Sequence, residues 1–436
     1  MLDSVGCSLV QVNRRGGAAD RCRRSVSWLV LLLLGAEWSR GGEWPQWRGP
    51  RRDGVLVGES LPLRLPENPK VVFRRSLGEG HAGPVMASQR VVVLDNAGQQ
   101  ETAHCLDFRT GDTLWSAPYG ELYSDEFGSG PRCTPLIDDD RLYVQSCKGE
   151  FRCLGLADGK TRWRFHFSDY GMAWIPDKNS GGGAASRRGN TGSAVIDGER
   201  IFVQVGSTQG ASIVAFDKRD GRLLWKSQND LASYSSLSAG RLAGEPQVVA
   251  ATCEGLLALA THDGRLLWRQ PFKTRANRNV LTPLLLGDDV IFAACSIPLH
   301  RQRIVAKDGA LKPTGLWTNQ SLNINLVTPT LAGNHLYGIG AERSQHYVCV
   351  DAFTGQLAWS RTGFGEVTST VTDGTRLLLL TESGECLLLA ADPNRLVELG
   401  RFQAVGKTFA HPAYAQGILI ARDSREVVAF NLAALR

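Results

Sequence analysis

The sequence predicts an all-β protein, a β-propeller of eight blades with four antiparallel strands in each blade. A phrase that begins Cys105-Leu106-Asp107 and continues to Gly111 and Trp115 returns several times along the chain. The tryptophans that end the phrase are 42 to 49 residues apart, with one gap of 62. Glycine is abundant, with 48 residues, and helix-forming runs are scarce, which suits short strands joined by tight turns. A repeat of roughly 40–45 residues is typical of a four-stranded propeller blade.

Each repeat reads as four strands in a fixed order. The first strand is short and apolar and follows a step such as Thr282-Pro283. An Asp/Gly turn leads to a second strand rich in β-branched and aromatic residues, the third strand carries the small–aliphatic–Asp phrase, and the fourth carries Trp. We expect this large side chain to wedge against the neighbouring blade, with its N–H donating to a nearby acceptor. The repeat tryptophans are Trp115, Trp163, Trp225, Trp268, Trp317 and Trp359.

Eight first strands can be counted, but the last repeat ends after three strands. The first strands begin near Pro84, Pro135, Ala194, Ser238, Pro283, Pro329, Thr370 and Pro412. The segment 70–77 precedes the first repeat and has the pattern of the missing outer strand. We therefore predict that it completes the last blade and closes the ring, which leaves no open seam between blades. The propeller domain is predicted to cover residues 70–436.

The N-terminus has the composition of an export signal. Three arginines, Arg21, Arg23 and Arg24, precede the apolar run 26–36, which is too short to span a bilayer but suits the core of a signal peptide. An uncleaved anchor or a misassigned start is the alternative. We predict a signal peptide and leader in residues 1–42 and a lead-in segment in residues 43–69. The mature chain is then expected in the periplasm or cell envelope, without a transmembrane span.

The charge of the chain does not favour a nucleic-acid partner. The formal net charge is +6, and residues 1–42 supply half of it through six arginines and three acidic residues. The charge left for the rest of the chain is weak, and no stripe of Lys and Arg accompanies it.

The ten cysteines permit disulfides in an oxidising compartment, but their positions favour another role. Cys105, Cys153 and Cys349 occupy a slot that alanine fills in other repeats, which is typical of a small buried apolar residue. Cys147 and Cys153 flank a turn and could meet across a hairpin, so a bridge between them stays open.

The repeated phrase resembles the quinoprotein-type repeat family, whose units are called PQQ-like repeats. The resemblance covers about residues 70–436, and the prefix from Trp44 through Trp47 to Gly54 resembles the lead-in of a group of exported members. One branch of this family is the eight-bladed quinone-dependent alcohol dehydrogenases. Another is the non-catalytic lipoprotein propeller of the outer-membrane β-barrel assembly machinery. The repeat residues are structural, so they imply the fold more strongly than an activity.

The sequence does not supply the parts of a dehydrogenase. The resemblance implies that such an enzyme would need calcium and quinone ligands, a catalytic Asp and a pair of adjacent cysteines, and no two cysteines are adjacent here. Metalloprotease and serine-hydrolase motifs are also missing from the sequence. We therefore predict no catalytic residue and no cofactor. Pyrroloquinoline quinone and calcium belong only to the alternative of a dehydrogenase-like enzyme.

Alignment of the blades on their first strands predicts a column of polar residues at the mouth of the central channel. Asparagine amides and a glutamate in such a column could bind a cation or a polar ligand. The structural alternative, that Asn caps turns at strand starts, is the preferred interpretation for any single residue. Whether the channel holds a metal stays open. The candidate residues are His81, Arg132, Asn190, Arg278, Asn279, Asn325, Glu366 and Lys407.

The gap of 62 residues holds the longest insertion, whose first half is aromatic. Phe167, Tyr170 and Trp174 are candidates for a partner-binding loop, because exposed aromatic residues on a long loop suit recognition. A lid packed over its own propeller is an equal alternative.

Taken together, these features favour a non-catalytic exported propeller that binds or scaffolds another exported or envelope protein. A quinone- and calcium-dependent dehydrogenase is the alternative. A weaker alternative is a carbohydrate-binding module that uses loop aromatics such as Trp174 and Tyr123. The sequence does not predict the oligomeric state.

Overall fold

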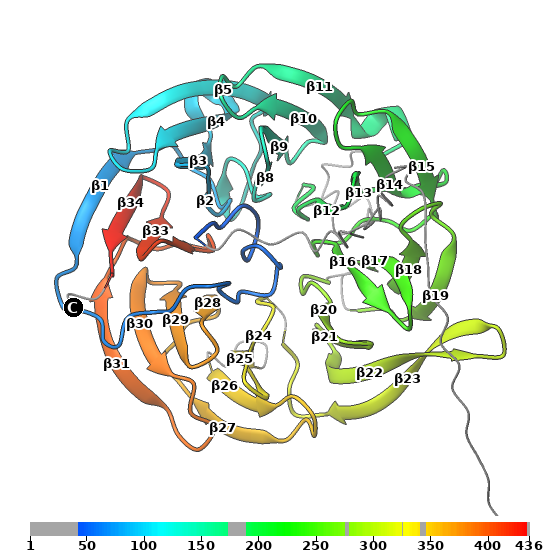
Figure 1. Ribbon diagram of the computed structural model, residues 1–436. Coiled ribbons are helices and arrows are strands. Elements are labelled where there is room, and N and C mark those ends of the chain that lie inside the picture. The colour runs from blue at the N-terminus through cyan, green and yellow to red at the C-terminus, as the bar shows by residue number, and fades with distance from the viewer. Residues whose placement is uncertain (1–41, 173–188, 275–278, 325, 341–345, 434–436) are drawn as a thin grey trace, which may run out of the picture. The chain divides into compact units, whose positions relative to one another are not determined.

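The computed structural model describes residues 42–172, 189–274, 279–324, 326–340 and 346–433. All of them belong to one compact unit, Ser39–Arg436. Its strands form eight four-stranded antiparallel sheets arranged around a ring (Figure 1). The predicted fold class, an eight-bladed propeller of PQQ-like repeats, is confirmed. The predicted signal peptide lies almost wholly outside the described residues. Within the described part of the chain, no helix has the length and hydropathy of a membrane span.

The blades are numbered in chain order, and in each the strands run from the centre of the ring to its rim (Figure 1). Blades 1 and 2 consist of β2 (Val85–Ala87), β3 (Arg90–Asp95), β4 (Gln100–Asp107) and β5 (Thr113–Glu121), and of β8 (Leu136–Asp138), β9 (Arg141–Gln145), β10 (Glu150–Gly155) and β11 (Thr161–His166). Blades 3 and 4 consist of β12 (Val195–Asp197), β13 (Arg200–Ser207), β14 (Ala211–Asp217) and β15 (Leu223–Ser227), and of β16 (Ser238–Leu242), β17 (Glu245–Thr252), β18 (Gly255–Ala260) and β19 (Leu266–Pro271).

The second half of the ring repeats this order. Blades 5 and 6 consist of β20 (Leu284–Leu286), β21 (Asp289–Ala294), β22 (Ile297–Lys307) and β23 (Ala310–Asn319), and of β24 (Thr330–Ala332), β25 (His335–Gly340), β26 (His346–Asp351) and β27 (Leu357–Arg361). Blades 7 and 8 consist of β28 (Thr368–Thr372), β29 (Arg376–Thr381), β30 (Glu385–Ala390) and β31 (Val397–Gln403), and of β32 (Ala413–Ala415), β33 (Ile418–Arg422), β34 (Glu426–Asn431) and β1 (Lys70–Ser76). The smaller elements are the hairpin β6 (Ser124–Asp125) and β7 (Gly128–Ser129) and the 3-10 helices η1 (Ala97–Gln99) and η2 (Phe167–Tyr170).

The ring closes by the predicted strand exchange between the two ends of the propeller. β1 pairs antiparallel with β34, from Lys70 opposite Asn431 to Ser76 opposite Glu426. Phe73 in β1 is only 4 % exposed. Its ring packs against Gly111 of blade 1, where a Cβ atom would lie 2.4 Å from the phenyl ring. Phe73 therefore takes, at the closing seam, the place that tryptophan takes in other blades.

The sequence predicts that each repeat tryptophan contacts the neighbouring blade, and most of them donate a hydrogen bond to it. The indole N–H of Trp225 donates to the carbonyl of Thr261 in the next blade at 3.1 Å, and Gly264 lies against its ring. Trp268 is the exception, because its N–H donates to Gln247 of its own blade at 2.8 Å. Four others make the same kind of contact as Trp225, namely Trp115 with Leu156, Trp163 with Lys218, Trp317 with Ala352, and Trp359 with Asp392.

Their burial is less uniform than the repeat suggested. Trp225, Trp268 and Trp359 are buried, whereas Trp115 and Trp317 are only partly buried, as is Trp163. These tryptophans lie on the outermost strands of their blades, and no further strand covers those strands (Figure 1).

A belt of hydrogen bonds runs around the channel at the entry to the first strands. At this position the backbone N–H of one blade donates to the hydroxyl group of the next blade. The bonds join Gly83 to Thr134, Thr134 to Ser193, Ser193 to Ser236, Ser236 to Thr282 and Thr282 to Thr328, at 3.0–3.2 Å. Three Thr-Pro steps, together with Ser193 and Ser236, thus connect six consecutive blades.

Replacing one hydroxyl in this belt should weaken the ring measurably. Thr282→Val removes the acceptor of the buried Ser236 N–H without changing the size of the side chain. A buried donor left without a partner costs about 1–3 kcal/mol, so we expect the free energy of unfolding to fall by about that amount. Urea unfolding of the wild type, Thr282→Val and Thr282→Ser measures it. Thr282→Ser keeps the hydroxyl group, and an equal loss in both variants would contradict a role for the hydrogen bond.

All eight cysteines in the described residues are buried free thiols. Cys147 and Cys153 therefore form no bridge with each other in this structure. Cys105, Cys153 and Cys349 are fully buried on third strands, in the alanine slot where the sequence placed them. These thiols pack as small apolar groups, and burial raises the pKa of each above its ordinary value.

Candidate functional site

The lead-in segment crosses the ring and contacts blades that are far apart in the sequence. The backbone groups of Trp44 and Met86 exchange two hydrogen bonds of 2.8 Å at blade 1. Further along the segment, the N–H of Leu56 donates to the carbonyl of Thr372 in blade 7, also at 2.8 Å. Figure 1 shows this dark-blue stretch across the centre of the ring. The lead-in is thus part of the folded propeller and lies over its central channel.

Two arginines of the lead-in anchor it to the inner strands of separate blades. Arg48 donates through Nη2 to the carbonyl of Pro329 at 2.8 Å and to the hydroxyl of Thr330 at 2.7 Å, both at blade 6. Arg52 donates through Nη1 to the carbonyl of Ala194 at blade 3, at 2.8 Å. These contacts join the lead-in segment to the propeller, although the sequence predicts the two as separate segments.

The two guanidinium groups lie over one aromatic ring. The Cζ atoms of Arg48 and Arg52 are 5.5 and 5.4 Å from the ring centroid of Trp47. His411, just before β32, meets the same ring edge-on at 5.5 Å. We call Trp47, Arg48, Arg52 and His411 the arginine plug. Cation–π attraction of this kind grows when the cation is removed from water.

Burial controls the charges of the arginine plug. Burial lowers the pKa of Arg48 to about 10, and burial together with the charge of Arg48 lowers the pKa of Arg52 to about 9. Burial, with a further contribution from Arg48, lowers the pKa of His411 to about 3. At neutral pH both arginines are therefore charged and the imidazole is neutral. The plug carries two positive charges at the channel.

Two of the predicted channel-mouth residues come together around Phe409. The ring of His81 lies 5.6 Å from that of Phe409, and the ammonium group of Lys407 lies 5.2 Å from it. Lys407 is exposed and also forms an ion pair with Glu382 at 3.0 Å. Burial first, and then the positive charges nearby, lower the pKa of His81 to about 4. A neutral imidazole and a paired lysine are weak evidence for a ligand site here.

Arg132, another predicted mouth residue, belongs to a closed local network. Its guanidinium pairs with Asp125 at 2.6 Å and lies 5.1 Å from the ring of Tyr123. Tyr123 is only 5 % exposed. Its ring is therefore not available to stack on a sugar in this structure.

The predicted asparagines that the structure describes form hydrogen bonds with nearby residues of the propeller. Asn279 is fully buried, accepts from Thr274 at 2.9 Å and donates to the carbonyl of Thr252 at 2.6 Å. Asn190 is buried, and its amide lies 2.9 Å from the sulfur of Met172. These contacts match the structural alternative stated for asparagine at strand starts.

The remaining predicted mouth residues do not add to a site. Glu366 is exposed, and its backbone N–H donates to Glu382 at 3.2 Å. Arg278 and Asn325 lie outside the described residues. Of the eight candidates, the six that the structure describes all make contacts with neighbouring residues of the propeller.

The described half of the long insertion packs onto blade 3. Phe167 is fully buried, and Tyr170 meets Phe216 edge-on at 5.6 Å. Phe165 stacks on Phe216 at 4.1 Å. This half follows the lid alternative rather than that of an open partner loop. Trp174, the third predicted loop residue, lies outside the described residues.

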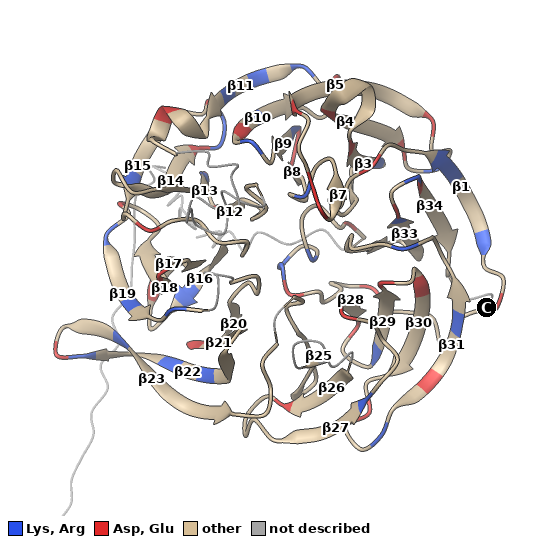
Figure 2. Cartoon of the chain, turned by 180° about the vertical axis from the view of Figure 1, so that it is seen from behind, with Lys and Arg blue, Asp and Glu red and all other residues tan. Residues whose placement is uncertain are grey.

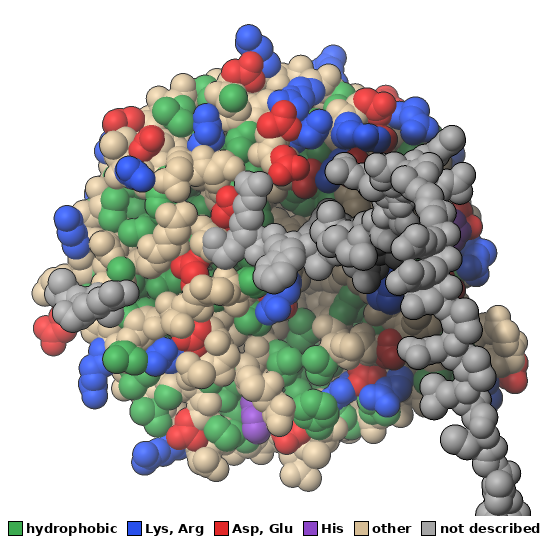
Figure 3. Space-filling model, viewed as in Figure 1, with side chains coloured by type: hydrophobic (Ala, Val, Ile, Leu, Met, Phe, Trp, Pro, Cys, Tyr) green, Lys and Arg blue, Asp and Glu red, His purple; other side chains and the backbone are tan. Residues whose placement is uncertain are grey.

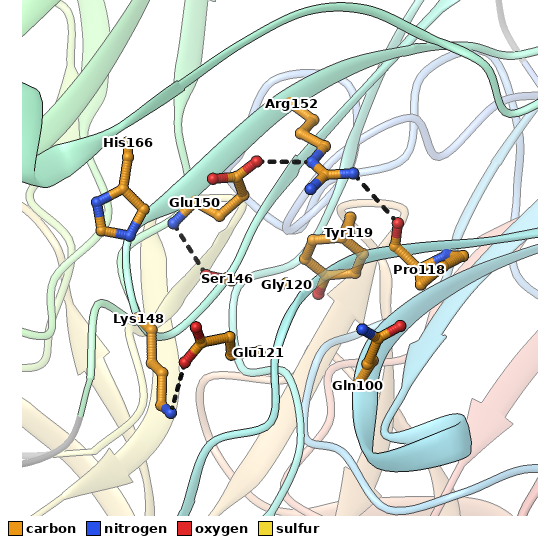
Figure 4. Close-up of a pocket in the computed structure, with 10 residues that line it drawn as sticks. All are labelled: Gln100, Pro118, Tyr119, Gly120, Glu121, Ser146, Lys148, Glu150, Arg152 and His166. Carbon is orange, nitrogen blue, oxygen red and sulfur yellow. Dashed lines mark hydrogen bonds and ion pairs between the residues drawn. The ribbon is translucent and has the colours of Figure 1, made fainter.

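A pocket of about 630 Å³ lies between blades 1 and 2 (Figure 4). Its charged side chains already pair with one another, since Lys148 contacts Glu121 at 3.0 Å and Arg152 contacts Glu150 at 2.7 Å. The full lining consists of Gln100, Pro118, Tyr119, Gly120, Glu121, Ser146, Lys148, Glu150, Arg152 and His166.

A buried glutamate lies close to this pocket. Glu101 is fully buried, and its carboxylate accepts from the backbone N–H of Cys147 at 3.3 Å. It also interacts with the hydroxyl group of the buried Tyr119, which lines the pocket. Burial, only partly offset by the Cys147 amide, raises the pKa of Glu101 to about 7.

The raised pKa makes the stability of the protein depend on pH in a defined direction. The ordinary pKa of a glutamate is 4.5. Below pH 4.5 Glu101 therefore does not disfavour folding. As the pH rises through 7, the charged carboxylate disfavours folding progressively. We expect Glu101→Gln to stabilise the protein at pH 9 by up to roughly 3 kcal/mol and to have little effect at pH 4. Urea unfolding at several pH values measures this. A difference between variant and wild type that does not change with pH would contradict it.

The arginine plug and Glu101 were both missed by the sequence analysis. The prefix from Trp44 to Gly54 stands out in the sequence, but nothing in it indicates which blades its arginines contact. Glu101 lies near the start of the third strand of blade 1, whose sequence QETAHCLD mixes polar and apolar residues, so no sequence signal marks it as buried.

Comparison with known proteins places the chain in a family. The family profile described as "Outer membrane protein assembly factor BamB" matches residues 52–210 and 99–361. The chain belongs to this family. No functionally curated protein matches the sequence.

Several solved structures share the fold of this family member at low sequence identity. BamB from Moraxella catarrhalis is 15 % identical, with a TM-score of 0.55 over 84 % of this chain and 98 % of that chain. The quinohemoprotein alcohol dehydrogenase ADHIIG from Pseudomonas putida HK5 is 10 % identical, with a TM-score of 0.59 over 91 % and 81 % of the two chains. The computationally designed Ika8 protein is 13 % identical, with a TM-score of 0.54 over 81 % and 98 %. At these identities the likeness concerns the fold alone.

The arginine plug does not have the composition of a calcium site. Calcium prefers six to eight oxygen ligands, with carboxylates among them. The arginine plug instead presents two guanidinium groups and a neutral imidazole. Among the described residues, no group of three or more His, Cys, Asp or Glu side chains is placed to hold a metal ion.

Proposed function

We propose that this protein is an exported, non-catalytic propeller that binds or scaffolds another envelope protein. The family profile named after an outer membrane protein assembly factor supports this proposal. The arginine plug supports it too, because its cationic side chains do not suit calcium, which prefers oxygen ligands. We therefore expect the partner to bind the outer surface of the propeller.

A projecting hairpin in blade 5 is the observation that carries the proposal. β21 pairs with β22 only as far as Arg303, yet β22 and β23 continue to pair with each other from Ile304 opposite Pro313 to Lys307 opposite Ala310. The resulting two-stranded ribbon leaves the ring (Figure 1), and basic residues lie along it (Figure 2). A two-stranded ribbon is at best marginally stable alone. Its base packs on the core through Ile304 and Leu311, whereas residues 306–310 at its tip are exposed and are free to contact a partner.

The rest of the described surface is consistent with a protein partner. On the described part of the face in Figure 3, hydrophobic, basic and acidic side chains are interspersed. Such a mixed surface does not present the continuous basic stripe that nucleic-acid binding requires. It suits recognition by shape and by a few exposed anchors.

Site-specific photo-crosslinking tests the proposed function. A photoreactive amino acid replaces Lys312 on the hairpin, which is half exposed, in the full chain with its leader. The matched control replaces Lys160, an exposed lysine of blade 2. We expect a discrete crosslinked envelope protein from Lys312 and none from Lys160. Retention of the chain in the cytoplasm, or equal products from both positions, would argue against the proposal.

The dehydrogenase alternative makes a separate prediction. We expect purified protein supplied with pyrroloquinoline quinone and calcium to reduce an electron-accepting dye with alcohols no faster than a protein-free control. The reason is the cationic side-chain chemistry of the plug, together with the lack of an adjacent cysteine pair in the sequence. A rate well above the control that also saturates with alcohol would establish the alternative.

A further inference from the structure

The arginine plug concentrates positive charge without a matching acid. Arg48 is 2 % exposed, and its hydrogen bonds go to carbonyl groups and one hydroxyl. Arg52 donates to two carbonyl groups and to the amide oxygen of Gln46. Among the described residues, neither guanidinium lies within ion-pair distance of a carboxylate. Burying two like charges in this way is unfavourable unless something compensates for them.

The acid nearest in the sequence is already engaged. The Asp53 carboxylate pairs with the exposed Arg51 at 3.2 Å and accepts from the backbone N–H of Val55 at 2.9 Å. Only its backbone carbonyl contacts Arg48, at 2.9 Å. Asp53 therefore lowers the electrostatic cost at Arg48 from a distance and leaves both guanidinium groups unpaired.

Each guanidinium group also has one nitrogen that forms no hydrogen bond with the described residues. Arg48 Nη1 and Arg52 Nε are shielded from solvent and have no acceptor among the described residues. Unpartnered buried donors are rare in folded proteins, and a bound water or ion commonly explains them. The two donors belong to guanidinium groups that lie over the same ring, that of Trp47.

We propose that the arginine plug binds a small oxyanion of the phosphate or sulfate class. Guanidinium groups bind such anions through paired, charge-assisted hydrogen bonds. The anion would offset the positive charge of the two guanidinium groups and accept hydrogen bonds from them. It would also secure the lead-in between blades 3 and 6, to which Arg52 and Arg48 are anchored. This site is independent of the proposed partner binding, since it lies at the channel rather than on the hairpin.

The pocket between blades 1 and 2 lacks these features. Its Lys148 and Arg152 are paired with Glu121 and Glu150, so their charges are already compensated. The plug differs because Arg48 is buried, Arg52 is partly buried, and neither has an ion-pair partner among the described residues.

Calorimetry on the full-length protein tests the site. Sodium phosphate and sodium sulfate are titrated into the wild type, Arg52→Gln and Arg51→Gln at constant ionic strength, with chloride as the blank. Arg51 is a matched control because it is exposed and belongs to the same segment. We expect saturable binding to the wild type and to Arg51→Gln. Affinity should be at least about tenfold weaker in Arg52→Gln, the equivalent of about 1.4 kcal/mol.

A second variant and a second readout guard against misfolding. Arg52→Lys keeps the charge but loses the planar fork, so it should bind more weakly than the wild type while remaining folded. Hydrogen exchange of the lead-in amides should slow when phosphate is added to the wild type and should not change in Arg52→Gln. The proposal is overturned if the wild type shows no saturable binding. It is also overturned if Arg52→Gln and the wild type bind phosphate equally, or if acetate and chloride have the same effect as phosphate.

Discussion

Replacing Trp225 by alanine is expected to lower the free energy of unfolding by about 3–5 kcal/mol, as truncation of large buried aromatic residues does. Trp225 is 8 % exposed and lies on β15, the outermost strand of blade 3. Its indole packs against Gly264 of blade 4 and donates to the carbonyl of Thr261. The substitution would leave a cavity between two blades and an acceptor without its donor.

Leu223 supplies the matched control for this prediction. It lies two residues away on the same strand and is 41 % exposed. Leu223→Ala should change the stability by less than about 1 kcal/mol, because an exposed side chain loses little on truncation. Denaturant unfolding of both variants measures the difference. Equal losses would mean that the indole does not lock blade 3 to blade 4.

Trp174→Ala addresses the long insertion in the same experiment. The partner-loop hypothesis predicts a loss under ~1 kcal/mol, because such a residue would serve a partner rather than the core. A loss as large as that of Trp225→Ala would instead indicate a packed lid.

Replacing Phe73 by alanine should have a comparably large effect, because this residue closes the ring. We expect a loss of about 3–5 kcal/mol in the free energy of unfolding. Phe73 is nearly fully buried in β1, where it lies against Gly111 of blade 1. Gly111 has a positive φ of 70°, so its backbone suits glycine and brings the turn close to the phenyl ring.

The control for Phe73 lies on the same strand. Val71 is 43 % exposed, and Val71→Ala should cost well under the loss at Phe73. Hydrogen exchange adds a local readout, since an open seam should release the β34 amides that pair with β1. Unchanged protection in β34 despite a large loss of stability would show that Phe73 acts elsewhere than at the closure.

The repeat made much of the fold predictable. Eight first strands, three strands in the last repeat and a spare strand at 70–77 together implied a closed ring, and β1 does pair with β34. Strand patterning and turn residues are local properties, so a single sequence displays them. The Thr-Pro steps were also visible, although their role as acceptors in a belt between blades was not.

The candidate site could not be predicted in the same way. Alignment of the repeats placed Asn279 at the channel mouth, yet its amide bonds to Thr274 in its own loop and to the carbonyl of Thr252 in β17. Phe167 was a candidate for a partner-binding loop, with a packed lid as the equal alternative, and in the structure it is fully buried. Position in a repeat indicates where the backbone goes, whereas the direction and partners of each side chain depend on neighbours from other blades.

The sequence by itself determined the eight blades, their closure and the tryptophan joints, because these depend on patterns that recur every few tens of residues. Only the tertiary structure decided that the lead-in lies over the channel. Arg52 bonds to a residue 142 positions away, and Arg48 bonds to one 281 positions away. No local pattern encodes contacts over such separations. Arg48 and Arg52, which no sequence pattern singles out, therefore come together over Trp47 only when the ring has closed.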